Sequence, residues 1–295
     1  MQKEKRSGVV VVMGRPNVGK STLINSWVGS KVSIVSEKPE TTRHRIAGIV
    51  NTSEAQIVFL DTPGIHESGK LLNKIMVRKA WFAVEEADVL LLLVEAGRSP
   101  SLEEKRIIEG IQRFSKPVFL LINKIDLVKR SKLLTQIDQY QALYPFKAII
   151  PISALKRDGI PVVEKEILPC LSVGPAYYTE DQWTDQTERF LVEELIREKI
   201  FKETYEEIPY ETAVRIESFQ DKERVTVIEA TILVEKQSQK GIVIGKKGGT
   251  LKKIGEEARN EIELLLDRKV FLQLWVKVEE GWSKKEESLK RLGLL

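Results

Sequence analysis

The chain has 295 residues, of which 42% are hydrophobic and 31% charged, a composition typical of well-ordered globular domains. Its formal net charge of +4 is too small for the whole surface to attract a polyanion. A nucleic-acid site would therefore have to depend on a local cluster of basic residues.

The cysteine count and the lengths of the apolar runs indicate where in the cell the protein is expected to be. Cys170 is the single cysteine, which excludes a disulfide framework or a cysteine-rich zinc site within one chain. The longest apolar run, VLLLLVEA from Val89, is far shorter than the roughly 20 residues of a membrane span. The N-terminal stretch does not resemble a secretory signal. We expect a cytoplasmic protein with no membrane span.

The first part of the chain alternates short apolar runs with longer amphipathic segments. Valine, isoleucine and leucine dominate five runs, as expected for parallel strands buried on both faces: 9–13, 56–62, 88–96, 117–124 and 148–153. A less hydrophobic strand is predicted at 45–52, and helices at 20–29, 70–87, 101–114, 132–144 and 159–171. This order predicts a doubly wound, mostly parallel α/β domain over residues 1–173, with ligands at the carboxyl ends of its strands.

The alternation ends in a segment rich in Gly, Pro, Thr and Asp, residues 174–187, which we interpret as an interdomain linker. Residues 188–295 follow a different order and predict an α+β domain with a C-terminal tail. Its predicted elements are helix 188–208, strands 211–219 and 224–236, two helical stretches around a glycine loop, and strand 270–278.

A glycine–lysine loop, GRPNVGKS, follows the first predicted strand and precedes a helix. It fits the phosphate-binding pattern G-x-x-x-x-G-K-[ST] through Gly14, Gly19, Lys20 and Ser21. Backbone N–H groups and the helix dipole of such a loop surround the β-phosphate. We predict that Lys20 bridges phosphate oxygens and that the Ser21 hydroxyl holds Mg²⁺. The same predicted site includes the neighbouring residues Asn17, Val18 and Thr22.

Three further motifs, each directly after a predicted strand, complete a guanine-nucleotide site. DTPG places Asp61 where it can reach Mg²⁺ through water, and Gly64 where its N–H can meet the γ-phosphate. NKID selects the base, because the two Asp126 oxygens match the N1–H and N2–H donors of guanine. Adenine would leave that carboxylate unpaired, at a cost of about 1–3 kcal/mol. SAL offers the Ala154 N–H to guanine O6. The other predicted members are Asn123, Lys124, Ser153 and Leu155.

These motifs predict a GTP-binding domain whose hydrolysis chemistry lacks one usual part. Many GTPases carry a glutamine directly after the D-x-x-G glycine to orient the attacking water. Here that position is Ile65, whose alkyl side chain cannot do so. His66 is expected to be an exposed loop residue. We predict slow turnover, with catalysis from phosphate positioning and from charge neutralisation by Lys20 and Mg²⁺.

A second glycine–lysine loop, VIGKKGG from Val243, has the wrong spacing for a phosphate loop, and no Ser or Thr comes directly after either lysine to hold a metal. The order strand, strand, helix, G-x-x-G, helix, strand resembles a KH domain of the bacterial type. In such domains the loop clamps about four single-stranded nucleotides. The alternative is a glycine helix cap flanked by solvated lysines.

The charge pattern favours the RNA clamp. From Asp181 onward the chain has 21 Lys+Arg and 24 Asp+Glu, whereas residues 236–253 contain six lysines and no acid. Such clustering favours a patch that faces RNA phosphates. The predicted RNA-binding residues are Gly245, Lys246, Lys247, Gly248, Lys240, Lys252 and Lys253. Trp275 or Trp282 could stack on a base, with Trp282 as the preferred candidate, and Ile242, Ile244 and Ile254 are expected in the core.

Together these residues resemble the Era family of TrmE-Era-EngA-type GTPases. The resemblance lies in GRPNVGKSTLINSWVGSKVSIVS, TTRHR (41–45), FLDTPGIH and NKID, and it extends from about residue 8 to 293, including a C-terminal type II KH domain. It implies that TTR belongs to switch I, where Thr41 or Thr42 completes the Mg²⁺ shell. It also implies that Asn17 supports a K⁺ ion where other GTPases use an arginine finger.

The resemblance further implies the partner and the role. The expected partner is single-stranded RNA from the 3′ region of small-subunit ribosomal RNA, and the expected role is the timing of 30S ribosomal subunit assembly. We expect a monomer. Weak peripheral contact with the inner membrane is also implied by the family, although the sequence offers no clear amphipathic basic helix for it.

Two other functions account for parts of the sequence. A P-loop phosphotransferase would need an acceptor pocket and a catalytic base, neither of which the sequence offers, and NKID argues against it. An RNA-binding scaffold with purely structural GTP would bind RNA equally well with GDP and with a non-hydrolysable GTP analogue.

Overall fold

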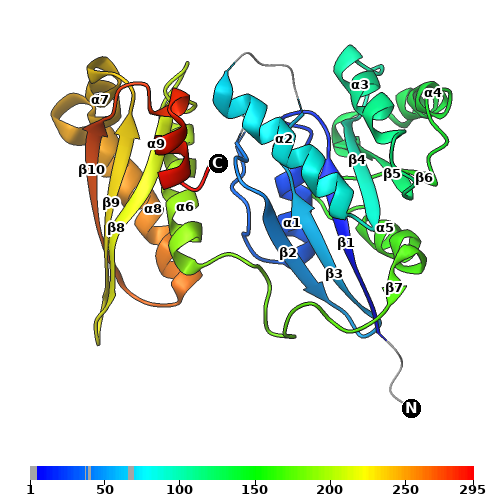
Figure 1. Ribbon diagram of the computed structural model, residues 1–295, viewed down its shortest axis with the longest axis horizontal. Helices are drawn as coiled ribbons and strands as arrows, with labels where there is room; N and C mark the ends of the chain where they lie inside the picture. The colour runs from blue at the N-terminus through cyan, green and yellow to red at the C-terminus, as the bar shows by residue number, and fades with distance from the viewer. Residues whose placement is uncertain (1–4, 37, 39–40, 66–69) are drawn as a thin grey trace. The chain divides into compact units, whose positions relative to one another are not determined.

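The computed structural model, shown in Figure 1, describes residues 5–36, 38, 41–65 and 70–295. The chain divides into two compact units. The first consists of Met1–Gly69 and Asn73–Asp185, and the second of Lys70–Leu72 and Gln186–Leu295.

The first unit is built on a seven-stranded sheet in the order β2-β3-β1-β4-β5-β6, with β7 beside β1. Its strands are β1 (Arg6–Met13), β2 (Ile46–Asn51), β3 (Ala55–Asp61), β4 (Val89–Glu95), β5 (Val118–Asn123), β6 (Ala148–Pro151) and β7 (Ser172–Val173). Among the strand pairs that the described residues form in this sheet, β2–β3 and β1–β7 are antiparallel and the others are parallel. The predicted doubly wound, mostly parallel sheet is therefore confirmed.

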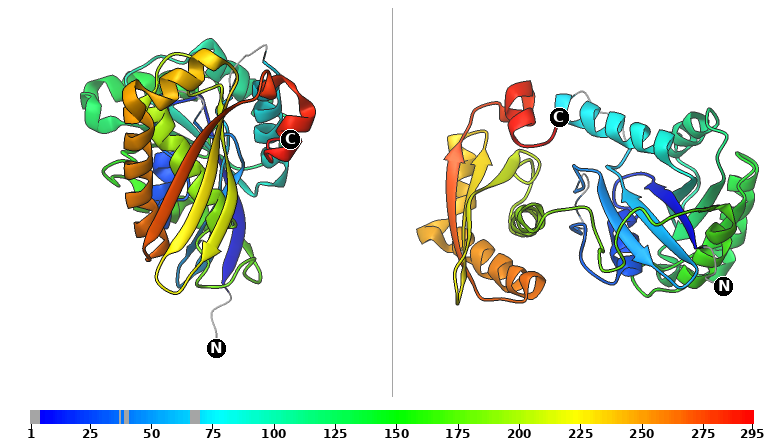
Figure 2. Two further views of the ribbon diagram at one scale, coloured as in Figure 1. Left: turned by 90° about the vertical axis from the view of Figure 1, so that its left-hand side faces the viewer. Right: turned by 60° about the horizontal axis from the view of Figure 1, so that its bottom comes forward.

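Helices cover both faces of this sheet (Figure 2). They are α1 (Lys20–Val28), α2 (Leu71–Glu86), α3 (Leu102–Ile111), α4 (Arg130–Gln141) and α5 (Ile160–Ile167), with short 3₁₀ turns η1 (Ile125–Leu127) and η2 (Leu168–Cys170). Val58 and Leu60 of β3 pack in one core with α2, α3 and α4. Phe59 points the other way and stacks on Trp27 of α1, with ring centroids 4.1 Å apart. The period-2 alternation of a strand thus supplies apolar side chains to both helical layers.

The second unit is a three-stranded sheet in the order β10-β9-β8, with helices packed on one face. Its elements are α6 (Glu188–Glu203), β8 (Thr212–Asp221), β9 (Thr226–Val234), α7 (Gln237–Ile244), η3 (Lys246–Gly248), α8 (Gly249–Leu266), β10 (Val270–Val278), η4 (Trp282–Lys284) and α9 (Glu286–Arg291). Alternate residues of β9, from Ile228 to Val234, enter one core with side chains from α6, α7 and α8. The α+β prediction is confirmed.

Helix α6 is shorter than the predicted 188–208. It ends at Glu203, because Thr204 takes an extended backbone conformation and its hydroxyl donates to the Ile200 carbonyl at 2.7 Å. A threonine hydroxyl that bonds back to a carbonyl competes with the next helical turn. The sequence pattern of charged and apolar residues continued past this point and did not reveal the stop.

Residues 175–185, here called the strap, lie along the first unit. The buried Gln56 side chain accepts from Tyr177 N and Tyr178 N and donates to the Tyr178 carbonyl. Further on, Ile49 N donates to the Trp183 carbonyl at 2.9 Å. The strap lies within residues 174–187, which the sequence predicted as a linker. The domain limits 1–173 and 188–295 remain a prediction.

A bilayer-crossing segment would require a long apolar helix. Among the described parts of the chain, none of the helices has the combination of length and hydropathy needed.

Candidate functional site

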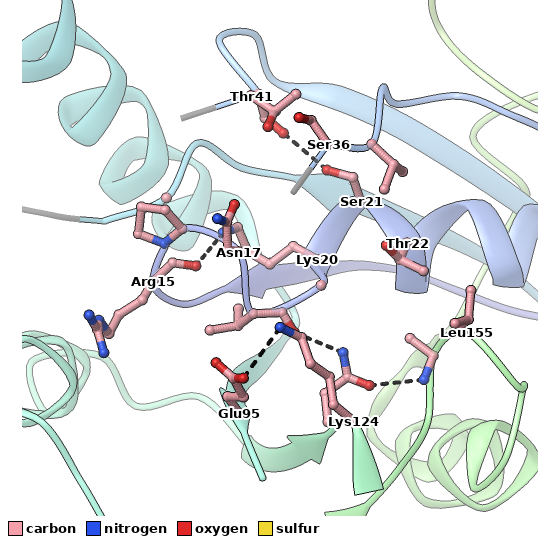
Figure 3. Close-up of a pocket in the computed structure, with 18 of the residues that line it drawn as sticks. Arg15, Asn17, Lys20, Ser21, Thr22, Ser36, Thr41, Glu95, Lys124 and Leu155 are labelled. Atoms are coloured by element: carbon pink, nitrogen blue, oxygen red, sulfur yellow. Dashed lines mark hydrogen bonds and ion pairs between the residues drawn. The ribbon is translucent and has the colours of Figure 1, made fainter. Parts of the chain in front are cut away.

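A cavity of about 800 Å³ opens at the carboxyl ends of the parallel strands. It is lined by most of the residues predicted to hold nucleotide and metal: Asn17, Val18, Gly19, Lys20, Ser21, Thr22, Thr41, Thr42, Gly64, Asn123, Lys124, Asp126, Ser153, Ala154 and Leu155. Figure 3 shows Ser21 reaching toward the segment that carries Thr41, while Glu95 and Lys124 lie together at the other end. The two remaining predicted residues, Gly14 and Asp61, contact residues of this lining: the Gly14 carbonyl accepts from Lys20, and the Asp61 carboxylate accepts from Ser21.

The phosphate loop has a backbone that only glycine can supply at two positions. Gly14 and Gly19 have φ angles of 148° and 100°. A Cβ at Gly14 would lie 2.4 Å from the Leu93 carbonyl oxygen, and one at Gly19 would lie 2.3 Å from Nδ2 of Asn123. The glycines are therefore needed for close approach as well as for the turn, as the motif predicts.

Lys20 is buried at the base of this loop. Its ammonium group donates to the carbonyl oxygens of Gly14 at 3.2 Å and Arg15 at 2.9 Å. Burial lowers the pKa of Lys20 to about 8, and the Asp61 carboxylate opposes that shift. A buried ammonium held by neutral carbonyls can bind phosphate oxygens without first being stripped of water.

A carboxylate and two hydroxyls meet beside the loop. Oδ2 of Asp61 accepts from Ser21 Oγ at 2.7 Å and from Thr42 Oγ1 at 3.3 Å, and the two hydroxyls lie 3.1 Å apart. The Thr41 hydroxyl instead donates to the Lys38 carbonyl at 3.0 Å. Of the two threonines left open by the sequence, Thr42 is therefore the one brought to Ser21 and Asp61.

These residues fit Mg²⁺. The cation prefers oxygen ligands and usually combines one or two carboxylates with substrate phosphates and water. Oδ1 of Asp61 is buried and has no hydrogen-bond partner among the described residues. Burial raises the pKa of Asp61, while Lys20 and the neighbouring hydroxyls act against that rise. A metal hydrate beside this carboxylate would favour its ionised form. In the part of the chain that the structure covers, no group of three or more His, Cys, Asp or Glu side chains forms an alternative metal site.

The base end is organised around two side chains. Asn123 donates from Nδ2 to the Val18 carbonyl at 2.8 Å and accepts from Ala154 N at 2.9 Å. It thereby ties the phosphate loop to the loop after β6. Oδ1 of Asp126 accepts from Ser153 Oγ at 2.7 Å, and this bond lowers the pKa of Asp126. Asp126 is thus kept ionised, as pairing with two guanine donors requires. The Ala154 N–H, predicted to meet guanine O6, serves Asn123 in this structure.

Ile65 takes no part in the cavity lining. Its side chain is 9% exposed and packs in the core shared with α2 and α3, while its N–H donates to the Gly14 carbonyl at 3.2 Å. The side chain at the usual glutamine position therefore points into the core. His66 lies outside the described residues.

Several residues of the site were missed by the sequence patterns. Glu95, at the end of β4, forms ion pairs with Lys124 at 3.6 Å and Arg98 at 3.5 Å, and all three line the cavity. Its position at a strand end was the available signal. The side chain of Ser33 is buried near Asp61, and no motif pointed to it.

The GKKG turn of the second glycine–lysine loop lies between α7 and α8. Gly245 combines φ 74° with ψ 175°, and a Cβ there would lie 2.2 Å from Thr250 Oγ1. Lys247 and Gly248 also have positive φ, of 52° and 77°. The Lys246 and Lys247 side chains are exposed. The turn thus presents two cations to solvent from a tightly folded backbone.

The other lysines predicted to bind RNA, Lys240, Lys252 and Lys253, are less available to a phosphate backbone. Lys253 forms an ion pair with Glu203 at 2.7 Å, and hydrogen bonding to that carboxylate raises its pKa. Lys252 lies 3.8 Å from Glu256. Lys240 is half-buried. The sequence count of six lysines without an acid therefore overstates the uncompensated charge, because Glu203 of α6 and Glu256 of the next turn of α8 each lie beside one of these lysines.

The preference for Trp282 as a base-stacking residue is wrong for this structure. Its side chain is fully buried, and Nε1 donates to the Glu211 carbonyl at 3.0 Å, so it anchors the C-terminal tail. Trp275 remains 47% exposed on β10. Of the isoleucines expected in the core, Ile254 is buried but Ile242 is 54% exposed beside the GKKG turn.

Comparison with known proteins gives matches along the whole chain. Residues 9–124 match the family described as 50S ribosome-binding GTPase, and residues 207–283 match the KH domain family. The chain is 51% identical over 290 residues to the GTPase Era of Geobacter metallireducens, covering 98% of this chain and 97% of that protein. It is 48% identical over 289 residues to the GTPase Era of Ruminiclostridium cellulolyticum, with 98% and 97% covered.

Two solved structures resemble the whole fold. Era in complex with MgGDPNP and nucleotides 1506–1542 of 16S ribosomal RNA superposes with a TM-score of 0.96 and 41% identity, covering 98% of this chain and 99% of that one. A single-site variant of Aquifex aeolicus Era bound to GDP and AlF₄⁻ gives 0.95 and 41%, with the same coverage.

Proposed function

The chain belongs to the Era family of GTPases, and from this premise we propose that its GTP hydrolysis controls binding to the 3′ region of small-subunit ribosomal RNA. The reaction is GTP + H₂O → GDP + phosphate. The single observation that carries the RNA part is the likeness to Era solved with MgGDPNP and 16S ribosomal RNA. The exposed GKKG lysines of the KH unit supply the matching surface here. Such a switch would time a step of 30S subunit assembly.

The residues of the cavity account for hydrolysis by positioning and charge. Lys20 and the N–H groups of the phosphate loop hold the phosphates, and Asp126 and Asn123 hold guanine. Ser21, Thr42 and Asp61 would hold Mg²⁺, which would supply positive charge to offset that of the phosphates. Since Ile65 is turned into the core, no side chain at its position orients the attacking water, and slow intrinsic turnover follows.

The strap supports a route from the nucleotide to the KH unit. Thr42 lies at the metal site, and five residues later Ala47 is bonded to the strap. The Thr184 hydroxyl donates to the Ala47 carbonyl at 2.7 Å, and Ala47 N donates to Asp185 Oδ1 at 3.1 Å. Helix α6 of the second unit starts at Glu188. A shift of switch I can thus be passed through the start of β2 to the chain that leads into α6. These bonds give a physical connection between the nucleotide state and the RNA-binding unit.

The coupling is tested by removing one of these hydrogen bonds. Thr184→Val deletes the donor and keeps the shape. We expect a reduced ratio of RNA affinities between GTP-analogue and GDP states, with unchanged GTP affinity. The matched control is Thr179→Val, in the same strap but exposed. An unchanged ratio in Thr184→Val would exclude this route while leaving the proposed function open.

The proposed function itself is tested by RNA affinity in each nucleotide state. An RNA equivalent to nucleotides 1506–1542 is titrated against the full chain with a non-hydrolysable GTP analogue and with GDP. We expect tighter binding with the analogue, since only the γ-phosphate orders both switches. Equal affinities would instead support the scaffold with purely structural GTP.

The proposal has three further parts that rest on the family resemblance. Asn17, in the phosphate loop with φ 63°, is expected to support K⁺, and equal GTPase rates in matched KCl and NaCl would remove that idea. The protein is expected to be a cytoplasmic monomer, which sedimentation equilibrium checks. Weak peripheral membrane contact is checked by flotation with anionic vesicles.

A further inference from the structure

Three charged side chains form a cluster at the base end of the nucleotide cavity. Glu95 is the last residue of β4, and its two carboxylate oxygens face different cations. Oε1 lies 3.6 Å from Lys124 Nζ, and Oε2 lies 3.5 Å from Arg98 Nη1. All three residues line the cavity, and a dashed line joins Glu95 to Lys124 in Figure 3. One carboxylate thus holds two cations at the edge of the site.

The position of Glu95 is fixed by backbone hydrogen bonds. The parallel strands β4 and β5 pair Glu95 with Asn123, and Ala96 N donates to the Asn123 carbonyl at 2.8 Å. Gln136 of α4, which is buried, donates to the Glu95 carbonyl at 2.9 Å and accepts from Gly97 N at 2.8 Å. An amide that bonds on both sides in this way fixes the turn after β4. The Glu95 carboxylate therefore projects from a well-anchored strand end.

Lys124 has far more conformational freedom of its own. It lies in the NKID motif with φ 68° and ψ 36°, and its side chain is 31% exposed. A lysine ammonium sits on a flexible four-carbon stem, and ordering that stem costs conformational entropy. A carboxylate held in one place restricts the ammonium and, with it, the stem. The stem can then form a stable part of the cavity wall.

We propose that Glu95 is a positioning residue of the guanine site, which holds the Lys124 ammonium at the edge of the cavity so that the Lys124 stem packs against one face of the base. Lysine stems commonly cover apolar surface while the charged head stays in water. Asp126 and Asn123 serve the edge of the base, and Lys124 confines its face. We therefore expect Glu95 to affect nucleotide affinity and not the chemical step, which takes place at the phosphate loop.

The inference rests on the guanine-nucleotide binding proposed above and is tested by release kinetics. Full-length protein is loaded with a fluorescent GDP analogue, and its release is followed after addition of excess GDP. Glu95→Gln keeps the shape and removes the charge. We expect about threefold faster release, as for a partly exposed ion pair, and a similar rise in KM for GTP with unchanged kcat. The difference should shrink as NaCl is raised at fixed KCl, because salt screens such a pair.

A double-mutant cycle separates positioning from a structural role. Lys124→Met removes the ammonium but keeps most of the apolar stem. In that background Glu95→Gln should cause no further change in release, because its partner is already lost. Glu109→Gln, at an exposed position of α3, is the matched control for the loss of one negative charge, and it should release GDP at the wild-type rate.

Two results would overturn the inference. One is a wild-type release rate in Glu95→Gln. The other is an equal effect of Glu95→Gln with Lys124 and with Met at position 124, because Glu95 would then act independently of the ammonium. Failure of the wild type to bind any guanine nucleotide would instead overturn the proposed function.

Discussion

The two glycine–lysine loops of this chain use similar residues under opposite conditions. In the phosphate loop, Lys20 is 6% exposed and its pKa is lowered by burial. In the GKKG loop, the Lys246 and Lys247 side chains are exposed to solvent. In both loops a glycine is required because another atom lies within 2.5 Å of where its Cβ would be: Leu93 O at Gly14 and Thr250 Oγ1 at Gly245.

The contrast shows how burial decides what a lysine can do. A buried ammonium loses its hydration on folding, so it can stabilise charge that develops on a phosphate during a reaction. An exposed ammonium keeps its water and ions, and it attracts a phosphate backbone through a weaker, salt-dependent interaction. The first loop therefore suits catalysis on one small ligand, and the second suits reversible holding of a long one.

The largest effect is expected from removing the buried lysine. Lys20→Ala deletes the charge that neutralises phosphate oxygens, and we expect kcat for GTP to fall about a hundred- to a thousandfold. RNA affinity measured in GDP should stay within error. The control Lys132→Ala removes an exposed lysine of α4 from the same unit. A comparable loss of kcat in both variants would contradict the role given to Lys20.

The two glycines of the GKKG turn are expected to differ in how much stability is lost when each is replaced by alanine. Gly245→Ala should lower the free energy of unfolding of the KH unit by about 2–3 kcal/mol, because the new Cβ meets Thr250 in a region of backbone space reserved for glycine. Gly248→Ala should cost only about 1 kcal/mol, since its αL conformation is strained but the space around it is open. Denaturant unfolding checks both, and equal costs would show that the contact with Thr250 is unimportant.

Charge reversal in the exposed loop should weaken RNA binding without touching catalysis. For Lys246→Glu with Lys247→Glu we expect roughly tenfold weaker binding and a salt slope smaller by about 1.4, since two phosphate contacts are lost. GTP hydrolysis without RNA should be unchanged. Lys222→Glu with Arg224→Glu makes the same charge change in the exposed turn between β8 and β9. If that control weakens binding equally, the GKKG loop is not the clamp.

The smallest effect on rate is expected at the position after the D-x-x-G glycine. Ile65→Gln restores the residue common in other GTPases, yet we expect no gain in kcat, because the side chain points into the core with α2 and α3. Burying an amide there should lower the free energy of unfolding by about 1 kcal/mol. Single-turnover hydrolysis and thermal unfolding check the two parts. A faster rate would mean that the loop turns outward during catalysis.

Motifs at strand ends could be predicted because parallel strands bring their carboxyl ends to one edge. Local spacing and strand order were enough to predict the site residues Gly19, Lys20, Asp61 and Asn123. Glu95 was missed, although it also ends a strand, because a single acid carries no motif. The assignment of Trp282 failed because its indole bonds to the Glu211 carbonyl, 71 residues away, and local sequence does not report such a contact.

The sequence by itself determined the fold of each unit, the nucleotide and the metal, since these follow from periodic burial and from short motifs with fixed chemistry. Tertiary structure alone decided that Thr42 and not Thr41 meets Asp61, and that Glu203 neutralises Lys253. The physical reason is range. Backbone periodicity and motif spacing act over a few residues, whereas hydrogen bonds and ion pairs join residues that only the packed chain brings within about 3 Å.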